Sequence, residues 1–427
     1  MKSYRLALLL LAGFGVIGAQ TEIWTKITAT PGAASLPIAV ADFDLAVRSS
    51  TDVAEAARTI HDVLVRDLDN SLFFQLRLPG AGKVIASTAA GIDFSGWAAT
   101  GATILVAADI SRTTLTLRVY DLLSKRLVVA KDYPNSGNPR ALGHRLADAI
   151  LQLLTGEQGV ASSRIAFSRA VEQGRELFAI DQDGSNLQQI TDDGGLKLSP
   201  DWSSDGDHIA YSRYTGDRLA IFSLSLSSHK TTVICDRADM NDAPTWSPDG
   251  KLIAASLSTD KGQEISIIDP ASGNVQQITY NDCISTSPAW SPNGKQIAFV
   301  SDRAGSPQIY IVSADGADQH RLTFEGSYNT TPAWSPRGDI IAYSRRDGSV
   351  NQIWITDLEG ASSKQLTFSG NNVEPCFSPD GLHITFVSNR TGPDDIYVMN
   401  WDGTNQRRLT TLGGCSSPTW SPAQAVK

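Results

Sequence analysis

The second half of the chain consists of short segments in which apolar and polar positions alternate. Residues 296–300 and 308–312 form two such segments, and Asn293-Gly294 and Asp315-Gly316 stand at turn positions beside them. Alternation with a period of two residues is typical of β-strands, and Asn-Gly or Asp-Gly pairs favour tight hairpins. The pattern therefore predicts units of four short antiparallel strands.

This unit recurs at a nearly constant interval from residue 164 onward. A Pro-x-aromatic-Ser motif occurs six times, 43 or 44 residues apart, and begins at Pro200, Pro244, Pro288, Pro332, Pro375 and Pro418. A repeat of roughly 40 to 50 residues with four strands is typical of a β-propeller blade. Large aromatic residues at that interval fill the space between adjacent blades. We therefore expect a packing role for Trp202, Trp246, Trp290, Trp334 and Trp420.

The two ends of the repeat region complement each other. Five motifs precede a strand with isoleucine at residues 209, 253, 297, 341 and 384. The motif at Trp420 has no such strand after it, and the strand at Ile165 has no motif before it. We expect the segment at Trp420 to pair with the strand that begins at Arg164. The expected fold is a six-bladed propeller over residues 159–427, and its closure removes two exposed sheet edges.

Residues 20–158 show a different pattern, in which extended segments alternate with amphipathic helices. Apolar residues recur at helical spacing over residues 52–68, and a second helix is expected over residues 140–155. Extended segments are expected at residues 37–42, 73–78, 103–108, 114–121 and 127–133. The predicted fold class is therefore mainly β, with a C-terminal six-bladed propeller preceded by a small α/β domain.

The first residues have the pattern of a secretory signal. Lys2 and Arg5 precede an apolar run over residues 6–17, and Gly18-Ala19 offers small residues for cleavage. We expect residues 1–19 to be removed on export and the mature chain to be soluble; an uncleaved N-terminal anchor is the alternative. Residues 20–35 follow either as a mobile arm or as a first edge strand.

The formal net charge of −9 over 427 residues argues against partners that carry many phosphates. Nucleic acids and anionic membranes are bound through an excess of Lys and Arg, which this chain lacks. Its cysteines have no Cys-x-x-Cys spacing, so the sequence does not support a zinc site formed by them. Either two disulfides between blades or four buried thiols are expected from Cys235, Cys283, Cys376 and Cys415.

The sequence contains no recognisable catalytic motif. It has no Gly-x-Ser-x-Gly nucleophile elbow and no His-Glu-x-x-His zinc motif, and its six histidines do not cluster. We therefore expect a binding protein with no catalytic residue, cofactor or metal site. Two alternatives stay open. One is a hydrolase or lyase that uses Asp242 with Glu374 at the channel mouth, and the other is a propeller that binds a small molecule or sugar.

One end of the predicted propeller carries the more variable loops. In an antiparallel blade, the loop before the inner strand and the loop between the second and third strands lie at the same end. These loops include residues 240–243, 285–287, 328–331 and 371–374, and the arginines Arg169, Arg213, Arg303, Arg346 and Arg390. Converging polar loops predict a concave binding surface. A rim of solvated ion pairs is the alternative.

The repeats resemble those of the TolB family. Segments such as PTWSPDGKLIA and PAWSPNGKQIAFVSDRAGSPQIYIVSADG are similar to the TolB-type propeller repeat. The order of signal, small α/β domain and an Arg164-Ile-Ala-Phe entry into the propeller is similar too. The resemblance implies a monomeric periplasmic component of the Tol-Pal envelope system, without direct membrane insertion. Such a component supports outer-membrane invagination at cell division and the integrity of the envelope.

Two sets of binding residues are implied by this resemblance. The propeller face would bind the peptidoglycan-associated lipoprotein Pal through Met240, Asn241, Asp242, Ala243, Thr286 and Asn329. The N-terminal arm would bind a TolA-like inner-membrane protein through Thr21, Glu22, Ile23, Trp24 and Ile27. A docked arm and a released arm would then form a two-state switch.

Overall fold

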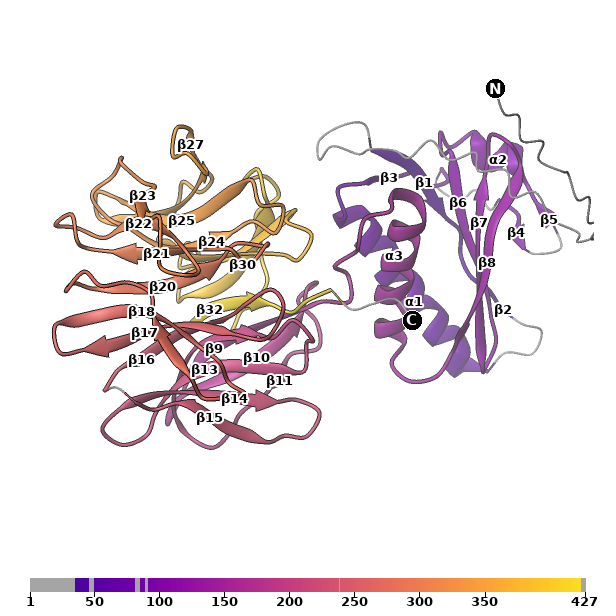
Figure 1. Cartoon of the computed structure of the whole chain (residues 1–427). Helices are drawn as coiled ribbons and strands as arrows, with labels where there is room; N and C mark the ends of the chain where they lie inside the picture. Colours follow the sequence, from indigo (N-terminus) through magenta and orange to yellow (C-terminus); the bar gives the residue numbers. More distant parts are fainter. Residues whose placement is uncertain (1–34, 46–49, 81–84, 89–90, 238, 424–427) are drawn as a thin grey trace, which may run out of the picture.

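A computed structural model describes residues 35–45, 50–80, 85–88, 91–237 and 239–423 of the chain. Figure 1 shows two parts, an α/β part formed by the N-terminal third of the chain and a ring of small sheets formed by the rest. The expected signal and the expected arm residues lie outside the described residues. Within the described ranges, no helix combines the length and the apolar character needed to cross a bilayer.

The N-terminal part is a mixed sheet with helices on both faces. The sheet has the order β3-β1-β6-β7-β8, in which β1 runs parallel to β3 and β6 while β6, β7 and β8 are antiparallel. Helices α1 and α3 bury one face of it, and α2 packs on the other. The elements are β1 (Leu36–Val40), β2 (Asp44–Leu45), α1 (Thr51–Asn70), β3 (Phe74–Leu76), β4 (Ser87–Thr88), β5 (Gly91–Ile92), α2 (Phe94–Ala98), β6 (Ile104–Ile110), β7 (Thr114–Asp121), β8 (Arg126–Pro134) and α3 (Pro139–Thr155).

The two long helices approach closely because Gly143 lies at their contact. A Cβ atom at this position would come within 2.9 Å of the Val63 side chain and 3.0 Å of the Ile60 carbonyl oxygen. The start of α3 is capped by Asn138, whose side chain accepts a hydrogen bond from the backbone N–H of Arg140 (2.9 Å). The helices and strands predicted for this part are confirmed, with shifts of at most two residues at their ends.

The remaining described residues form antiparallel sheets arranged in a ring (Figure 1). Four sheets have four strands each, and an eight-stranded sheet joins β12–β15 to β9, β10, β11 and β32. The joint is a short parallel pairing of Gly174 and Arg175 with Gly195 and Leu196. The fold is thus mainly β, a propeller that follows an N-terminal α/β part.

The strands of the eight-stranded sheet are β9 (Arg164–Val171), β10 (Gly174–Asp181), β11 (Gln188–Gln189), β12 (Gly195–Trp202), β13 (His208–Tyr214), β14 (Leu219–Ser225), β15 (Thr231–Cys235) and β32 (Cys415–Trp420). The next two sheets contain β16 (Asn241–Trp246), β17 (Ile253–Thr259), β18 (Gly262–Ile268), β19 (Val275–Gln277), β20 (Ser285–Trp290), β21 (Gln296–Ser301), β22 (Gln308–Ser313) and β23 (His320–Arg321). The last two contain β24 (Asn329–Trp334), β25 (Ile340–Asp347), β26 (Val350–Asp357), β27 (Ser363–Gln365), β28 (Asn372–Phe377), β29 (His383–Ser388), β30 (Asp395–Asn400) and β31 (Arg407–Arg408).

The ring closes through the pairing of its last and first strands. β32 lies antiparallel to β9, with Trp420 opposite Ile165, and the backbone N–H of Ser421 donates to the carbonyl oxygen of Arg164 (2.7 Å). The predicted pairing of the Trp420 segment with the Arg164 strand is confirmed. The predicted packing of the recurrent tryptophans is confirmed as well. Trp334 of β24, for example, packs against Ile309 of the preceding sheet.

Every inner strand contains a bulge immediately before its proline. The residue at this position has a positive φ between 48° and 57° in all six strands, namely Ser199, Ala243, Ser287, Thr331, Glu374 and Ser417. The pairing register of each inner strand shifts at the same place. A β-bulge bends the strand and changes the direction in which the local side chains point. The sequence gives no sign of this, since a residue before proline ordinarily favours an extended conformation.

Neighbouring sheets are linked by a recurring polar cluster. In one example, Gln352 Oε1 accepts hydrogen bonds from Thr367 Oγ1 (2.7 Å) in its own sheet and from Asn372 Nδ2 (2.9 Å) at the start of the next inner strand. Thr367 Oγ1 in turn accepts from the backbone N–H of Ile353 (2.8 Å). Because these groups are buried, each of them depends on the others for its hydrogen bonds.

Candidate functional site

The bulge residues lie around a channel enclosed by the inner strands. The channel contains a cavity of about 610 Å³, whose wall includes all six bulge residues and the proline and aromatic residue that follow each of them. The last residues of the expected loops, among them Asp242 and Glu374, line this cavity, which extends along the inner strands to the turns at their other end. We refer to this end of the propeller, where the inner strands begin, as the bulge end.

Two carboxyl groups inside the channel have raised pKa values. Asp201 Oδ2 accepts from the backbone N–H of Trp246 (2.8 Å) and Oδ1 from Thr419 Oγ1 (3.1 Å), while burial raises the pKa of Asp201 to about 6. Glu374 Oε2 accepts from the backbone N–H of Ser417 (2.6 Å), and burial raises its pKa too. Sequence reasoning missed Asp201. In the six Pro-x-aromatic-Ser motifs, Asp201 is the only charged residue at the position between the proline and the aromatic residue. An alignment of the repeats would have shown this difference.

We predict that Asp201 makes the protein less stable as the pH rises from about 4 to about 6. Its folded pKa lies above the ordinary value of 3.8, so the folded state binds the proton more tightly than the unfolded state. The stabilisation is complete below pH 4 and lost as the pH rises. Because the channel leaves part of the carboxyl group accessible, we expect a loss of about 1 to 2 kcal/mol. Urea unfolding at pH 4 and pH 7 measures it. The decline should be smaller in Asp201→Asn, and an equal decline in both proteins would contradict the prediction.

The two carboxylates considered as an acid–base pair lie on different sides of the channel. Asp242 comes from β16 and Glu374 from β28, with β20 and β24 between them along the ring. Asp242 Oδ1 accepts from Ser199 Oγ at 3.4 Å, which ties it to the neighbouring inner strand. This arrangement suits two separate polar groups in the channel wall better than an acid–base pair that acts on one substrate bond.

The six residues expected on the propeller face fall into two groups. Met240, Asp242, Ala243 and Thr286 are half-buried at the bulge end, where a partner can reach them. Asn241 and Asn329 are fully buried and hold neighbouring sheets together. Asn329 Nδ2 donates to Gln308 Oε1 (2.7 Å) and to the Glu325 carbonyl oxygen (2.9 Å). Asn241 Nδ2 donates to the Leu219 carbonyl oxygen (2.8 Å). These two asparagines therefore position the loops.

We predict that Asn329→Ala lowers the free energy of unfolding by about 1 to 3 kcal/mol, because it leaves buried acceptors without their donor. The matched control is Thr286→Ala at the half-buried neighbouring site, where a change within about 0.5 kcal/mol is expected. Urea unfolding of both variants measures the difference. Equal small effects in the two variants would mean that Asn329 does not hold the sheets together.

The five arginines expected at the bulge end lie over aromatic rings. The distances from the guanidinium carbon to the ring centre are 5.4 Å for Arg169 and Phe178, 5.8 Å for Arg213 and Phe222, 4.5 Å for Arg303 and Tyr310, 4.0 Å for Arg346 and Tyr328, and 4.9 Å for Arg390 and Tyr397. Such stacking holds a guanidinium in a defined position. The stacking orders the rim, and Arg213 is in addition ion-paired with the exposed Asp193 (2.6 Å), as the alternative expected.

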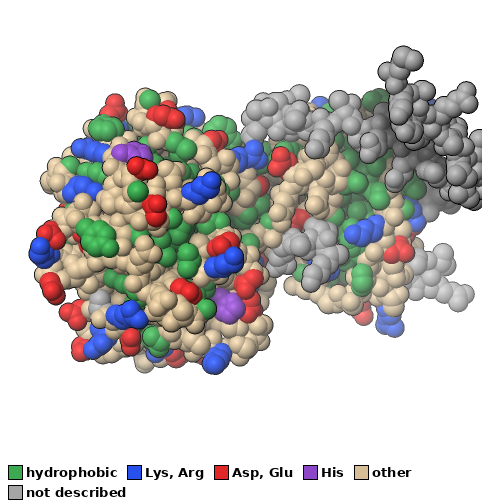
Figure 2. Space-filling view, viewed as in Figure 1, with side chains coloured by type: hydrophobic (Ala, Val, Ile, Leu, Met, Phe, Trp, Pro, Cys, Tyr) green, Lys and Arg blue, Asp and Glu red, His purple; other side chains and the backbone are tan. Residues whose placement is uncertain are grey.

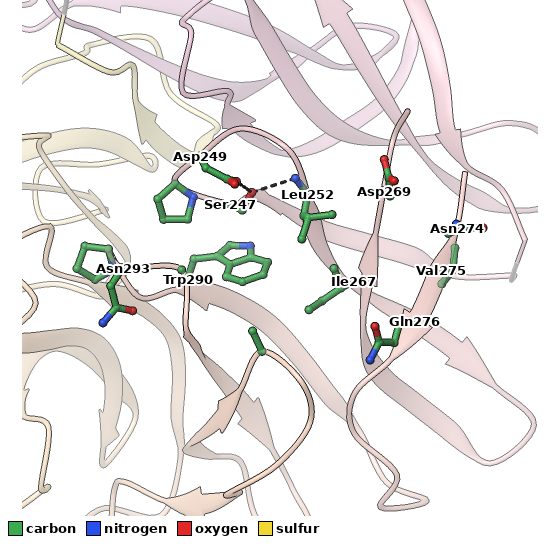
Figure 3. A pocket seen from close by; sticks show the side chains of 14 residues that line it. Ser247, Asp249, Leu252, Ile267, Asp269, Asn274, Val275, Gln276, Trp290 and Asn293 are labelled. Carbon is green, nitrogen blue, oxygen red and sulfur yellow. Dashed lines mark hydrogen bonds between the residues drawn. The ribbon is translucent and has the colours of Figure 1, made fainter. Parts of the chain in front are cut away.

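A second cavity of about 620 Å³ lies at the opposite end, between the sheets of β16–β19 and β20–β23 (Figure 3). Trp290 and Ile267 form part of its wall, and Ala314 stands where three other sheets carry Leu226, Leu358 and Trp401. The small side chain of Ala314 leaves the space unfilled. Some polar groups of the wall are engaged within the chain; Asp249, for example, accepts from Ser247 Oγ (2.7 Å).

The charges on the surface are mixed. Figure 2 shows acidic and basic side chains interspersed over the visible face of the propeller, with neither sign dominant. On this face there is no continuous basic surface of the kind that a phosphate backbone requires.

The cysteines do not pair with one another; Cys235 and Cys415 are buried and Cys283 and Cys376 are half-buried.

Two family models match the chain. The model described as TolB beta propeller domain matches residues 151–425, which is more than half of the chain, and the model described as TolB amino-terminal domain matches residues 26–128. The chain belongs to the TolB family.

A TolB from Acinetobacter baumannii has a similar crystal structure, with a TM-score of 0.78, 28% sequence identity and coverage of 91% of this chain and 97% of that one. Among curated relatives, the Tol-Pal system protein TolB of Syntrophotalea carbinolica is 34% identical over 40% of this chain and 42% of its own length. The protein of the same name from Geobacter sulfurreducens is 36% identical over 47% of each chain. In these alignments the chain spans less than half the length of the curated relatives.

Proposed function

We propose that this chain is a non-catalytic periplasmic binding scaffold of a Tol-Pal system. In this proposal the bulge end of the propeller binds a Pal-like peptidoglycan-associated lipoprotein, and the N-terminal arm binds a TolA-like inner-membrane protein. The protein thereby supports outer-membrane invagination at cell division and the integrity of the envelope. The observation that carries the proposal is that one chain matches both the amino-terminal and the propeller domains of TolB.

The site at the bulge end supports binding to a protein rather than to a small molecule. Half-buried polar side chains from neighbouring inner strands stand at this end: Asp242 lines the channel, and Thr286 lies next to the lining residue Ser287. Arginines held over aromatic rings form an ordered rim around them. A preordered surface with polar groups at defined positions loses little entropy when a folded partner binds.

We propose further that the ring has six blades and begins near residue 159, after an α/β domain over residues 20–158. The eight-stranded sheet then counts as two blades, since only a two-residue parallel pairing joins its halves. The six bulged inner strands support this count, because each blade contributes one of them.

Calorimetric titration of the exported chain with the periplasmic domain of the Pal-like lipoprotein from the same organism tests the proposal. Saturable one-to-one binding is the expected result. A parallel titration with a chain that lacks residues 20–34 tests the arm, because an arm that acts as a switch must change the affinity for Pal when it is removed. The absence of saturable binding by both chains would reject the scaffold, and equal affinities would reject only the switch.

A further inference from the structure

The junction between the two parts of the protein contains a cluster of charged side chains, most of which are buried. The turn between β10 and β11 lies against α1 and α3, and Asp183 Oδ2 in this turn pairs with Arg66 Nη1 (3.2 Å) and with Arg140. Next to it, Gln182 Nε2 donates to Asp67 Oδ1 of α1 (2.9 Å). Side chains that are far apart in the sequence thus meet in one polar cluster.

His144 of α3 lies at the centre of this cluster, and one of its two ring nitrogens has a hydrogen-bond partner. Its side chain is only 4% exposed, and Nδ1 lies 2.6 Å from Asp67 Oδ2. A carboxylate only accepts hydrogen bonds, so this contact places the proton on Nδ1 and leaves the lone pair of Nε2 available. Within the described residues Nε2 has no hydrogen-bond partner, although it is buried.

The lone pair of Nε2 faces another acceptor. Asp181 Oδ2 of β10 lies 4.0 Å away, which is longer than the 2.7–3.2 Å of a hydrogen bond. When His144 is neutral, two buried acceptors face each other here, and they repel unless a cation, either a proton on Nε2 or a metal ion, lies between them. Zinc takes histidine nitrogen and carboxylate oxygen at about 2.0 to 2.2 Å in a tetrahedral arrangement, which places neighbouring ligand atoms about 3.3 to 3.5 Å apart, so Nε2 and Oδ2 would move about 0.5 Å closer together around one ion.

A third carboxylate, that of Asp183, lies at the same place, and a metal ion would share it with Arg66, Arg140 and the backbone N–H of Ser185. Ligand atoms of His144, Asp181 and Asp183 all lie within 4.8 Å of one another. Asp67 has the position of the carboxylate that commonly orients a metal-binding histidine through its other ring nitrogen. Because an imidazole nitrogen is among the ligands, a transition metal such as Zn²⁺ fits better than Ca²⁺ or Mg²⁺.

We propose that His144, Asp181 and Asp183 form a Zn²⁺ site that joins α3 of the α/β part to the propeller. The bound ion stabilises the contact between the two parts, because its ligands come from both. Arg66 and Arg140 pair with Asp183, and Arg164 Nε lies 3.5 Å from Asp181 Oδ1. These positive charges oppose a further cation, so the affinity should be lower than that of a structural zinc site.

Equilibrium dialysis and calorimetry of the EDTA-treated full chain with Zn²⁺ test the site. One equivalent is expected to bind, and Co²⁺ at the same site should show visible absorption bands of a nitrogen–oxygen ligand set. His144→Gln and Asp181→Asn should abolish this binding. Asp67→Asn should weaken it by about 10- to 100-fold, as is typical for the loss of an orienting carboxylate.

The matched control is His383→Gln, which removes another histidine at the same junction. His383 Nε2 lies 3.1 Å from the Asn70 carbonyl oxygen, and Asp380 lies 3.9 Å from its Nδ1. This variant should bind Zn²⁺ as the unmodified chain does. Failure of the unmodified chain to bind Zn²⁺ would overturn the proposal, and so would undiminished binding by Asp181→Asn, a variant that preserves side-chain shape.

Discussion

Replacing Asp242 and Thr286 together by arginine is expected to weaken the binding of a Pal-like lipoprotein by at least about 100-fold. Both side chains are half-buried at the bulge end, on neighbouring inner strands. Long charged side chains there would block the channel mouth and place unpaired charges in the interface. A desolvated, unpaired charge at an interface typically costs about 2 to 5 kcal/mol.

The control for this double variant lies at the opposite end of the same strands. Asp249 and Asn293 belong to the turns that follow β16 and β20, so Asp249→Arg with Asn293→Arg adds equal charge away from the bulge end. Titration calorimetry should give an unchanged affinity for this control, and thermal unfolding should show that both variants are folded. Loss of binding in both double variants, or in neither, would contradict the assignment of the face.

The second large effect is expected at Lys197, the most deeply buried cation of the described residues. Its side chain is 0% exposed, and Nζ lies 3.0 Å from Glu176 Oε2 and 2.7 Å from Asp193 Oδ1. These contacts link β10 to β12. Lys197→Met removes the positive charge and leaves the buried carboxylate of Glu176 with hydrogen bonds from Thr191 and Gly194 but without a cation. We expect the free energy of unfolding in urea to fall by about 3 to 5 kcal/mol.

The chain itself suggests the variant that should recover this loss. Glu176 of β10 and Lys197 of β12 occupy the same strand positions as Gln352 of β26 and Asn372 of β28, which lie in neighbouring sheets and form a neutral hydrogen-bonded pair. The double change Glu176→Gln with Lys197→Asn recreates that neutral pair. It should restore most of the stability lost in Lys197→Met, because neither partner is then a buried unpaired charge. A loss of less than about 1 kcal/mol in Lys197→Met would show that the ion pair is not essential.

Most of the fold was predictable because it follows from local and repeated patterns. The Pro-x-aromatic-Ser repeat predicted the inner strands and the packing of their tryptophans, and the unmatched Trp420 motif predicted the pairing with the Arg164 strand. Helical periodicity placed α1 and α3 to within two residues. Alternation, helical spacing and turn pairs are properties of neighbouring residues, so the sequence displays them directly.

The candidate site was predictable only in outline. Position in the repeat brought Asp242 and Thr286 to the bulge end, but it also selected Asn241 and Asn329, whose side chains are buried between sheets. Repeat position determines the end of a strand at which a residue lies. Whether its side chain faces solvent depends on the bulge before each proline, and this bulge leaves no mark in the sequence.

By itself, the sequence determined the strands, the helices and the closure of the ring, because these depend on the period of apolar residues and on turn chemistry. Only the tertiary structure decided which polar side chains meet. Asp67, His144 and Asp181 lie on α1, α3 and β10, and no spacing along the chain relates them. These side chains meet because the α/β part packs against the propeller. The sequence pattern of each part predicts its own helices and strands, but it does not show which side chains of the two parts come into contact.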